Sequence, residues 1–300
     1  MPPVLLTDVT LREHGQNVRA SELGSFTPGE RAALALALRD AGFSRIEVIS
    51  CVHPRIAPAM ARDQLRAVLA ALGRLEGLEV VTLVPNPRGY DTFAELDLGP
   101  QGYGHTVGVF HSAMDAHNLA NVGRPVADTV ATIEGIARRA ASDRVRMTAY
   151  VSAAFGFVDG GGCRHPVPAA TVRDQVRRLF DLGAALVTLS DLQGVATTDE
   201  TSHLWDSVLA MDGGMFAARM GYHPHHEDPR GAVDLIGAAY RAGVRCFDSS
   251  LAAAGGCVTG APGNAPTEGV LARLEGMGAD TGIDVAAVAG LAPDWLAVGS

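Results

Sequence analysis

Short apolar runs alternate with longer amphipathic segments along the chain as far as about residue 276. In the longer segments apolar residues recur at helical spacing, whereas the short runs are rich in aliphatic and β-branched residues. This alternation predicts a parallel sheet that helices cover on both faces. The eight predicted strands are residues 4–9, 45–50, 78–84, 106–111, 144–152, 185–191, 216–223 and 244–250.

Helix start and stop signals support this pattern. Thr27 and Glu30 have the spacing of a capping box, and Pro28 stands between them at the first helical position. Two later helical segments end at Gly183 and Gly243, each of which leads into the next predicted strand. Strands and helices therefore follow one another with short connections.

Eight strand and helix units in 300 residues fit a closed barrel better than an open doubly wound sheet. The open sheet would predict a G-x-G-x-x-G loop after the first strand, and residues 8–17 contain none. We expect a single (β/α)8 TIM barrel over residues 1–276. Residues 277–300 have a weak apolar rhythm, and we expect them to pack as a short extension on the barrel or on a neighbouring subunit.

Composition narrows the chemistry. The chain is 47% apolar and 19% charged, which permits a large core. It carries 24 basic and 33 acidic side chains, a net charge of −9, so neither a nucleic acid nor an anionic membrane is an expected partner. All 24 basic residues are arginine, which excludes Schiff-base aldolases and pyridoxal-phosphate enzymes because both need a lysine amine.

The four cysteines, Cys51, Cys163, Cys246 and Cys257, are far apart and form no C-x-x-C pair. The chain shows no secretory or transit signal and no apolar stretch long enough to span a bilayer. We therefore expect a cytoplasmic protein with free thiols.

In a TIM barrel the active site lies at the carboxyl ends of the strands. Several polar side chains fall at those predicted ends: Arg12, Glu13 and Gln16 after the first strand, Glu47 in the second, Asp191 at the end of the sixth, His223 and His225 in the seventh, and Asp248 in the eighth.

His223 and His225 form the sharpest pair. Residues two apart on an extended chain present their side chains on one face, so both imidazoles can bind one ion. With Glu13 nearby, the donors are nitrogen and oxygen without thiolate, which suits Mg²⁺ or Mn²⁺ as well as Zn²⁺. The alternative is that His223, His225 and His226 belong to a solvated polar turn.

Other candidates carry structural alternatives as well. Glu47 and Asp191 are carboxylates in or after apolar strands and need partners, of which Arg12 is the obvious one; a salt bridge inside the barrel would satisfy the same need. Cys257 follows two glycines in a Gly-rich loop, where it is either a small core residue or a thiol acid on a mobile loop. Asn264 could simply cap the helix that starts at Pro266.

Together these segments resemble the metal-dependent superfamily of TIM-barrel carbon–carbon lyases and Claisen-condensing enzymes, and within it the 3-hydroxy-3-methylglutaryl-CoA lyases. The cysteine loop carries the strongest likeness, and further similar stretches occur along the barrel. They are residues 247–252, 255–257 and 263–268 for the loop, and residues 46–50, 84–86, 150–152 and 189–194 elsewhere.

The resemblance implies a role for each matching residue. The metal ligands would be Glu13, His223, His225 and Asn264. Arg12 would be the family's catalytic arginine, Glu47 its second-strand glutamate, Asp191 the general base and Cys257 the loop acid. We also expect Gln16, Asn86, Tyr150 and Ser152 to contact the substrate.

The implied activity is a divalent-metal-dependent retro-Claisen cleavage of a 3-hydroxyacyl-CoA to an acyl-CoA and an oxo acid, by a homodimer or higher homo-oligomer. Two features depart from the lyases: Glu13 replaces their usual aspartate, and the turn after His225 is longer. One alternative is a Claisen-condensing acyltransferase or a 4-hydroxy-2-oxo acid aldolase on the same barrel. The second alternative is a non-catalytic scaffold barrel.

Overall fold

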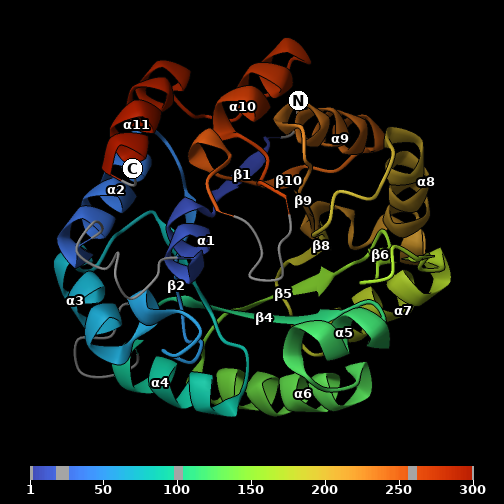
Figure 1. Ribbon diagram of the computed structural model, residues 1–300, viewed down its shortest axis with the longest axis horizontal. Coiled ribbons are helices and arrows are strands. Elements are labelled where there is room, and N and C mark those ends of the chain that lie inside the picture. The colour runs from blue at the N-terminus through green and yellow to red at the C-terminus, as the bar shows by residue number, and fades with distance from the viewer. Residues whose placement is uncertain (1–2, 18–26, 98–103, 256–261, 299–300) are drawn as a thin grey trace.

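A closed barrel of eight parallel strands lies at the centre of the molecule (Figure 1). The computed structural model describes residues 3–17, 27–97, 104–255 and 262–298. The last barrel strand pairs with the first, which closes the sheet and confirms the predicted TIM barrel. In chain order the barrel strands are β1 (Leu5–Asp8), β2 (Arg45–Ser50), β3 (Glu79–Leu83), β4 (Thr106–Ser112), β5 (Met147–Ser152), β8 (Val187–Asp191), β9 (Met220–Pro224) and β10 (Cys246–Ser249).

Helices surround the barrel as a ring (Figure 1). The strands are buried on both faces, because their side chains point alternately into the barrel and toward the helices. The helices are α1 (Thr10–Asn17), α2 (Pro28–Asp40), α3 (Arg62–Leu72), α4 (Pro87–Asp97), α5 (Asp115–Val122), α6 (Val126–Asp143), α7 (Ala169–Asp181), α8 (Thr198–Leu209), α9 (Pro229–Ala242), α10 (Thr267–Gly276) and α11 (Val285–Val298), with the 3-10 turns η2 (Pro58–Met60), η3 (Met211–Gly214), η4 (Ala217–Arg219) and η5 (Leu251–Ala253).

The helix ends follow the sequence signals. Thr27 accepts a hydrogen bond from the Glu30 amide, and the Glu30 carboxylate accepts one from the Thr27 amide, so the predicted capping box is present. Gly243 ends α9 in the left-handed region with φ 117°, a conformation that favours glycine. These signals are local, which is why the sequence alone predicts them.

Two strand starts are corrected by the structure. The predicted strand 144–152 begins at Met147, because Arg144 takes a left-handed conformation (φ 58°) that ends α6. The predicted strand 216–223 begins at Met220, because η4 precedes it and places the Arg219 guanidinium 4.6 Å from the centre of the Phe180 ring. In both places the residues before the strand, 144–146 and 216–219, belong to a connecting turn, so the strand begins later than the sequence pattern predicts.

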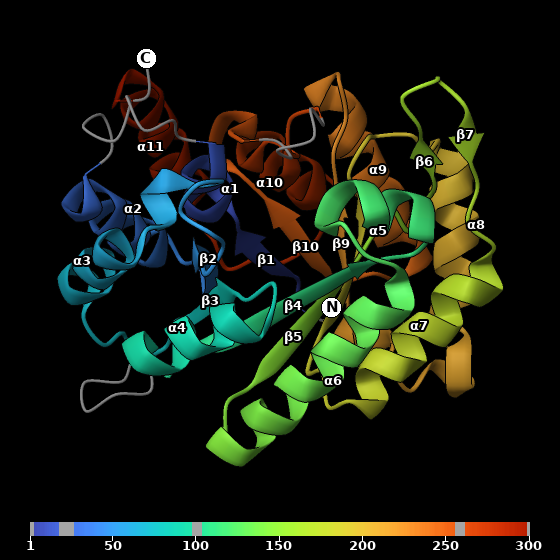
Figure 2. The ribbon, with the colours of Figure 1, turned by 60° about the horizontal axis from the view of Figure 1, so that its bottom comes forward.

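Three elements at the carboxyl ends of the strands were not predicted. They are the short helix α1 after β1, the separate helix α5 between β4 and α6, and a hairpin after β5 formed by β6 (Phe157–Val158) and β7 (Arg164–His165). Figure 2 shows α1, α5 and the hairpin gathered at one end of the barrel. That end carries the candidate site.

The C-terminal extension packs on the barrel. The Asp280 carbonyl accepts a hydrogen bond from the Val4 amide at 3.0 Å, and the Asp284 amide donates to the Ala41 carbonyl at 2.8 Å. Val288 in α11 is fully buried. None of the helices in the described chain has the length and apolarity that crossing a bilayer requires. The domain boundary at residue 276, the homo-oligomer and the cytoplasmic location stay predictions.

Asp8 predicts how stability depends on pH. Burial raises the pKa of its carboxyl from 3.8 to about 7, although hydrogen bonds from the Thr10 amide and hydroxyl oppose this. The folded chain therefore holds a proton that the unfolded chain releases above pH 3.8, so this group's contribution to stability is present at low pH and is lost as pH rises through 7. We expect the free energy of unfolding of wild type, relative to Asp8→Asn, to fall by about 2–3 kcal/mol between pH 5 and pH 8 in urea titrations. A difference that does not change with pH would contradict this assignment.

Candidate active site

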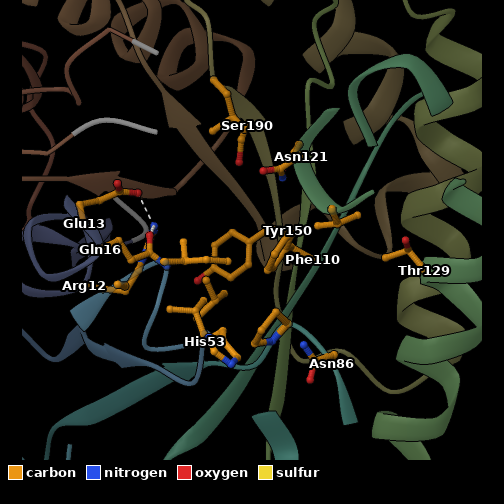
Figure 3. Close-up of a pocket in the computed structure, with 18 of the residues that line it drawn as sticks. Arg12, Glu13, Gln16, His53, Asn86, Phe110, Asn121, Thr129, Tyr150 and Ser190 are labelled. Carbon is orange, nitrogen blue, oxygen red and sulfur yellow. Dashed lines mark hydrogen bonds and ion pairs between the residues drawn. The ribbon is translucent and has the colours of Figure 1, made fainter. Parts of the chain in front are cut away.

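A cavity of about 340 Å³ opens at the carboxyl ends of the strands (Figure 3). Its walls come from six of the barrel strands or the loops that follow them, together with α1, α5, α6 and the connection between these last two helices. The lining residues are Arg12, Glu13, Gln16, Val52, His53, Ile56, Ala57, Leu83, Pro85, Asn86, Phe110, Asn121, Val122, Arg124, Thr129, Tyr150, Ser152, Ser190, Leu192 and His223.

Arg12 organises the charged side of this cavity. Its Nε donates to Glu47 Oε2 at 2.6 Å, and its Nη1 donates to Glu13 and, at 3.3 Å, to Gln16 Oε1. The Tyr150 hydroxyl donates to the other Glu47 oxygen. Glu47 is therefore held from two sides. Both donors, Arg12 and Tyr150, line the cavity, whereas Glu47 itself does not.

The pKa directions follow from these contacts. Burial would raise the pKa of Glu47, but the Arg12 guanidinium and the Tyr150 hydroxyl outweigh it, so the pKa is lowered and the carboxylate stays ionised. Burial and the Glu47 charge raise the pKa of Tyr150 well above 10. Burial opposes the charge of Arg12, but Glu13 and Glu47 raise its pKa further. The site thus holds a permanent cation and a neutral phenol.

Glu13, His223 and His225 bring their donor atoms within 4.8 Å of one another, and all three side chains are buried. His225 Nδ1 lies 2.8 Å from the Pro262 carbonyl, which can only accept, so Nδ1 carries the proton and Nε2 keeps its lone pair. His223 Nδ1 lies 3.2 Å from Asp248 Oδ2 and is oriented in the same way.

The two free imidazole nitrogens then face each other. His223 Nε2 lies 2.9 Å from His225 Nε2. Burial, followed by the nearby His223, lowers the pKa of His225 to about 3, so a proton on this ring is unfavourable. A cation near the two lone pairs resolves the repulsion, which is the first sign that this set fits a metal.

Asn264 supplies the second sign. It forms an isolated β-bridge with His225, and its Nδ2 donates to the Ala254 carbonyl at 2.9 Å. Its Oδ1 is buried and has no hydrogen-bond partner among the described residues. An unsatisfied buried oxygen is costly. An ion held by Glu13, His223, His225 and Asn264 would satisfy it, so the predicted four-ligand set fits a divalent cation.

A second set of donor atoms, Asp159, Cys163 and His165, lies in the β6–β7 hairpin. Here Asp159 accepts from the amides of Gly161 (2.9 Å) and Cys163 (3.0 Å), and it pairs with His165 Nε2 at 2.8 Å. These bonds satisfy the carboxylate within the hairpin. The set therefore stabilises a turn, in contrast to the unsatisfied groups at the barrel mouth.

The remaining predicted site residues fall into three groups. Gln16, Asn86, Tyr150 and Ser152 all line the cavity, although Asn86 also caps α4 by accepting from the Gly89 amide at 3.0 Å. Asp191 is not among the residues that line the cavity, and its oxygens accept from the amides of Val195 (3.1 Å) and Ala196 (2.9 Å). Burial raises its pKa. Cys257 lies outside the described residues.

Sequence reasoning missed one wall of the cavity. Asn121, Val122 and Arg124 come from the end of α5 and the connection to α6, and Thr129 comes from α6 itself. A sequence signal for this break exists: Gly123 interrupts an otherwise helical pattern. In the structure Gly123 ends α5 with φ 71°. It divides one predicted helix into two.

The sequence profile of the HMGL-like family matches residues 3–293. The chain belongs to the HMGL-like family. Among its relatives in this family, the hydroxymethylglutaryl-CoA lyase of Pseudomonas mevalonii is 32% identical over 292 residues, which are 96% of this chain and 90% of that protein. The (R)-citramalyl-CoA lyase of Chloroflexus aurantiacus is 30% identical over 306 residues, covering 99% of this chain and 90% of that one.

Solved structures in the HMGL-like family have the same architecture. An HMG-CoA lyase from Brucella melitensis superposes with a TM-score of 0.83 at 30% identity, over 99% of each chain. An HMG-CoA lyase from Acinetobacter baumannii, solved with coenzyme A and 3-methylmalate, gives a TM-score of 0.84 at 25% identity, over 99% of this chain and 91% of that chain. The likeness therefore spans the whole barrel.

His225 and the adjacent His226 give a matched test of the proposed metal site. His225 is buried with its Nε2 facing His223, whereas the side chain of the neighbouring His226 accepts from the Asp228 amide at 3.0 Å. We expect His225→Ala to weaken Mn²⁺ binding about 10-fold to 100-fold or more, because it removes a side chain that would coordinate the ion directly. His226→Ala should bind Mn²⁺ like wild type. Calorimetric titration measures both; equal affinities for the two variants would refute the ligand assignment.

Proposed function

We propose that this protein cleaves a 3-hydroxyacyl-CoA by a metal-dependent retro-Claisen reaction, giving an acyl-CoA and an oxo acid. One observation carries the proposal: the unsatisfied Asn264 oxygen and the facing histidine nitrogens adjoin Glu13, whose neighbour Arg12 faces the same cavity. Membership of the HMGL-like family, and relatives that are hydroxymethylglutaryl-CoA and citramalyl-CoA lyases, support a CoA thioester as the substrate.

A divalent cation held by the four ligands would supply Lewis-acid polarisation of substrate oxygens. The donor set of one carboxylate, two imidazoles and one amide contains no sulfur, and it suits Mg²⁺ or Mn²⁺ as well as Zn²⁺. The longer glutamate at position 13 retains the carboxylate that the family's usual aspartate would provide.

Arg12 stabilises the anion that the cleavage generates. When the hydroxyl proton leaves, the bond between C2 and C3 breaks, C3 becomes a carbonyl, and the electron pair passes to C2 and the thioester oxygen. A guanidinium fixed in advance by Glu13 and Glu47 can hydrogen-bond to that oxygen without reorganising. Tyr150 keeps Glu47 in place and stays neutral itself.

Asp191 would remove the hydroxyl proton, and Cys257 would return a proton to C2. The raised pKa of Asp191 makes it a stronger base than an exposed aspartate. Its two oxygens accept from the Val195 and Ala196 amides, and the amides of Gln193 and Gly194 also face this carboxylate. The same bonds fix the loop that carries Leu192 into the cavity wall, so Asp191 would also position the substrate.

A thioester panel tests the reaction. We expect wild-type protein with Mn²⁺ or Mg²⁺ to convert 3-hydroxy-3-methylglutaryl-CoA or a related 3-hydroxyacyl-CoA to an acyl-CoA and an oxo acid, and chelation by EDTA to stop turnover until the cation is restored. Mass spectrometry of the products fixes the direction. Free CoA released from acetyl-CoA plus a 2-oxo acid, without cleavage of any 3-hydroxyacyl-CoA, would favour the condensing alternative.

Asp191→Asn tests the base. The amide oxygen of the asparagine can still accept from loop amides as one carboxylate oxygen does, but it cannot take a proton at neutral pH. We expect kcat to fall about 10²-fold to 10⁴-fold, with the variant still binding Mn²⁺. Loss of one loop hydrogen bond should lower the free energy of unfolding by only about 1–3 kcal/mol. A kcat within a few-fold of wild type would show that Asp191 only positions the loop.

A further inference from the structure

Arg31 is a buried cation without a counter-ion among the described residues. It lies in the first turns of α2 and is 2% exposed. Arg12 and Arg45 are also buried, and each of them pairs with at least one glutamate. No described carboxylate pairs with Arg31, and its Nε and Nη1 have no hydrogen-bond partner in the described chain.

Such a cation is costly to bury. Burial lowers the pKa of Arg31 to about 10, so the guanidinium is still charged at neutral pH. A charge that leaves water without meeting an opposite charge destabilises the folded state. An apolar side chain of similar length would be more favourable for the core at this position. Packing alone therefore does not explain an arginine here.

The hydrogen bonds of Arg31 supply a reason. Its Nη2 donates to the Leu11 carbonyl at 2.7 Å and to the Val48 carbonyl at 3.2 Å. Leu11 directly precedes Arg12 in α1. Val48 directly follows Glu47 in β2. One guanidinium thus joins the two backbone segments that carry the members of the Arg12–Glu47 ion pair.

Helix α1 lies directly against this guanidinium. The helix packs on β2 (Figure 1) and has only eight residues, so its own hydrogen bonds give it little stability. Gly15 follows Leu11 by one turn, on the same face of the helix. A Cβ at Gly15 would be 2.6 Å from Nη2 and 2.8 Å from Nη1 of Arg31, closer than a side chain can approach. The contact between Arg31 and the backbone of α1 therefore requires glycine at this position.

The strand beneath α1 is irregular at the same point. The pairing of β2 with β3 changes register between Glu47 and Ile49, which leaves Val48 out of step with the ladder. Such an irregularity bends the strand and changes the direction of neighbouring side chains. The hydrogen bond from Arg31 to the Val48 carbonyl fixes the backbone there.

We propose that Arg31 is a positioning residue: it holds α1 against β2 and thereby sets the positions of Arg12 and Glu13 at the cavity. Arg31 does not line the cavity, so it acts through the helix. The inference rests on the proposed function, in which Glu13 is a metal ligand and Arg12 stabilises the anion. Displacing a catalytic group by ~1 Å can lower a rate ~10²-fold, so turnover depends on a fixed α1.

Four variants test this role. Arg31→Met removes the charge and both hydrogen bonds but keeps the length of the side chain, whereas Arg31→Lys keeps a cationic donor. Gly15→Ala retains Arg31 and forces its guanidinium away from α1. Arg39→Met is the control, because Arg39 lies on the same helix α2, is partly exposed and pairs with the adjacent Asp40 at 2.7 Å.

Calorimetric titration with Mn²⁺ is the deciding measurement, at a temperature where circular dichroism shows each variant folded. We expect Arg31→Met to weaken Mn²⁺ binding about 10-fold to 100-fold, as the loss of an outer support of a metal ligand does. Arg31→Lys should recover part of this loss, Gly15→Ala should also bind more weakly, and Arg39→Met should match wild type. With saturating Mn²⁺ and a thioester that wild type cleaves, kcat of Arg31→Met should fall about 10-fold to 100-fold.

Other outcomes separate this inference from the proposed function. Folded Arg31→Met and Gly15→Ala that bind Mn²⁺ as tightly as wild type would overturn the inference and leave the proposed function standing. If Arg31→Met does not fold, Arg31→Lys and Gly15→Ala decide in the same way. If wild type binds Mn²⁺ but cleaves no thioester, the proposed reaction is wrong, and weaker Mn²⁺ binding by Arg31→Met still supports the role of Arg31. A wild type that binds no Mn²⁺ would remove the metal site and this inference together.

Discussion

The arrangement of side chains at the carboxyl end of the barrel depends on neutralising the charge of one buried carboxylate, that of Glu47. Glu47 lies in the middle of β2 and is 1% exposed. The residues before and after it in the strand, Ile46 and Val48, are apolar. An isolated ionised carboxylate there would be very costly. Arg12 and Tyr150 neutralise and hydrogen-bond it, and in doing so both side chains acquire one orientation. The requirement for stability thus places a fixed guanidinium and a phenol at the edge of the cavity.

Three of the predicted metal ligands show the opposite condition, because the described residues do not satisfy all of their polar atoms. The neighbours of His223 and His225 take up the Nδ1 hydrogens and leave two lone pairs facing each other, and Asn264 keeps a buried oxygen without a donor. Proteins satisfy nearly all buried polar groups, so such a cluster marks a ligand. Comparison with the hairpin set at Asp159 supports this reading, since the hairpin satisfies its own carboxylate.

The sequence predicts the barrel and most of the site because their signals are periodic or local. Eight apolar runs define the strands, and the carboxyl ends of parallel strands meet at one rim, which is enough to bring Glu13, His223 and His225 together. It does not predict where side-chain oxygens point. Asp191 stands at a strand end as expected, yet its oxygens face the amides of the following loop, a choice that depends on the backbone conformation around Gly194.

The cavity wall formed by α5, α6 and their connection could not be predicted from the sequence for a related reason. A TIM barrel needs one helix after each strand, and the fourth unit has two, α5 and α6, divided at Gly123. Periodicity alone merges them, and a merged helix would direct Asn121 and Arg124 along its surface instead of into the mouth. The extra helical break therefore places residues of α5 and of the connection after it in the wall of the cavity. Asn118 accepts from the Ser112 amide and donates to the Arg124 carbonyl, so hydrogen bonds tie that break to the end of β4 and fix the position of this wall.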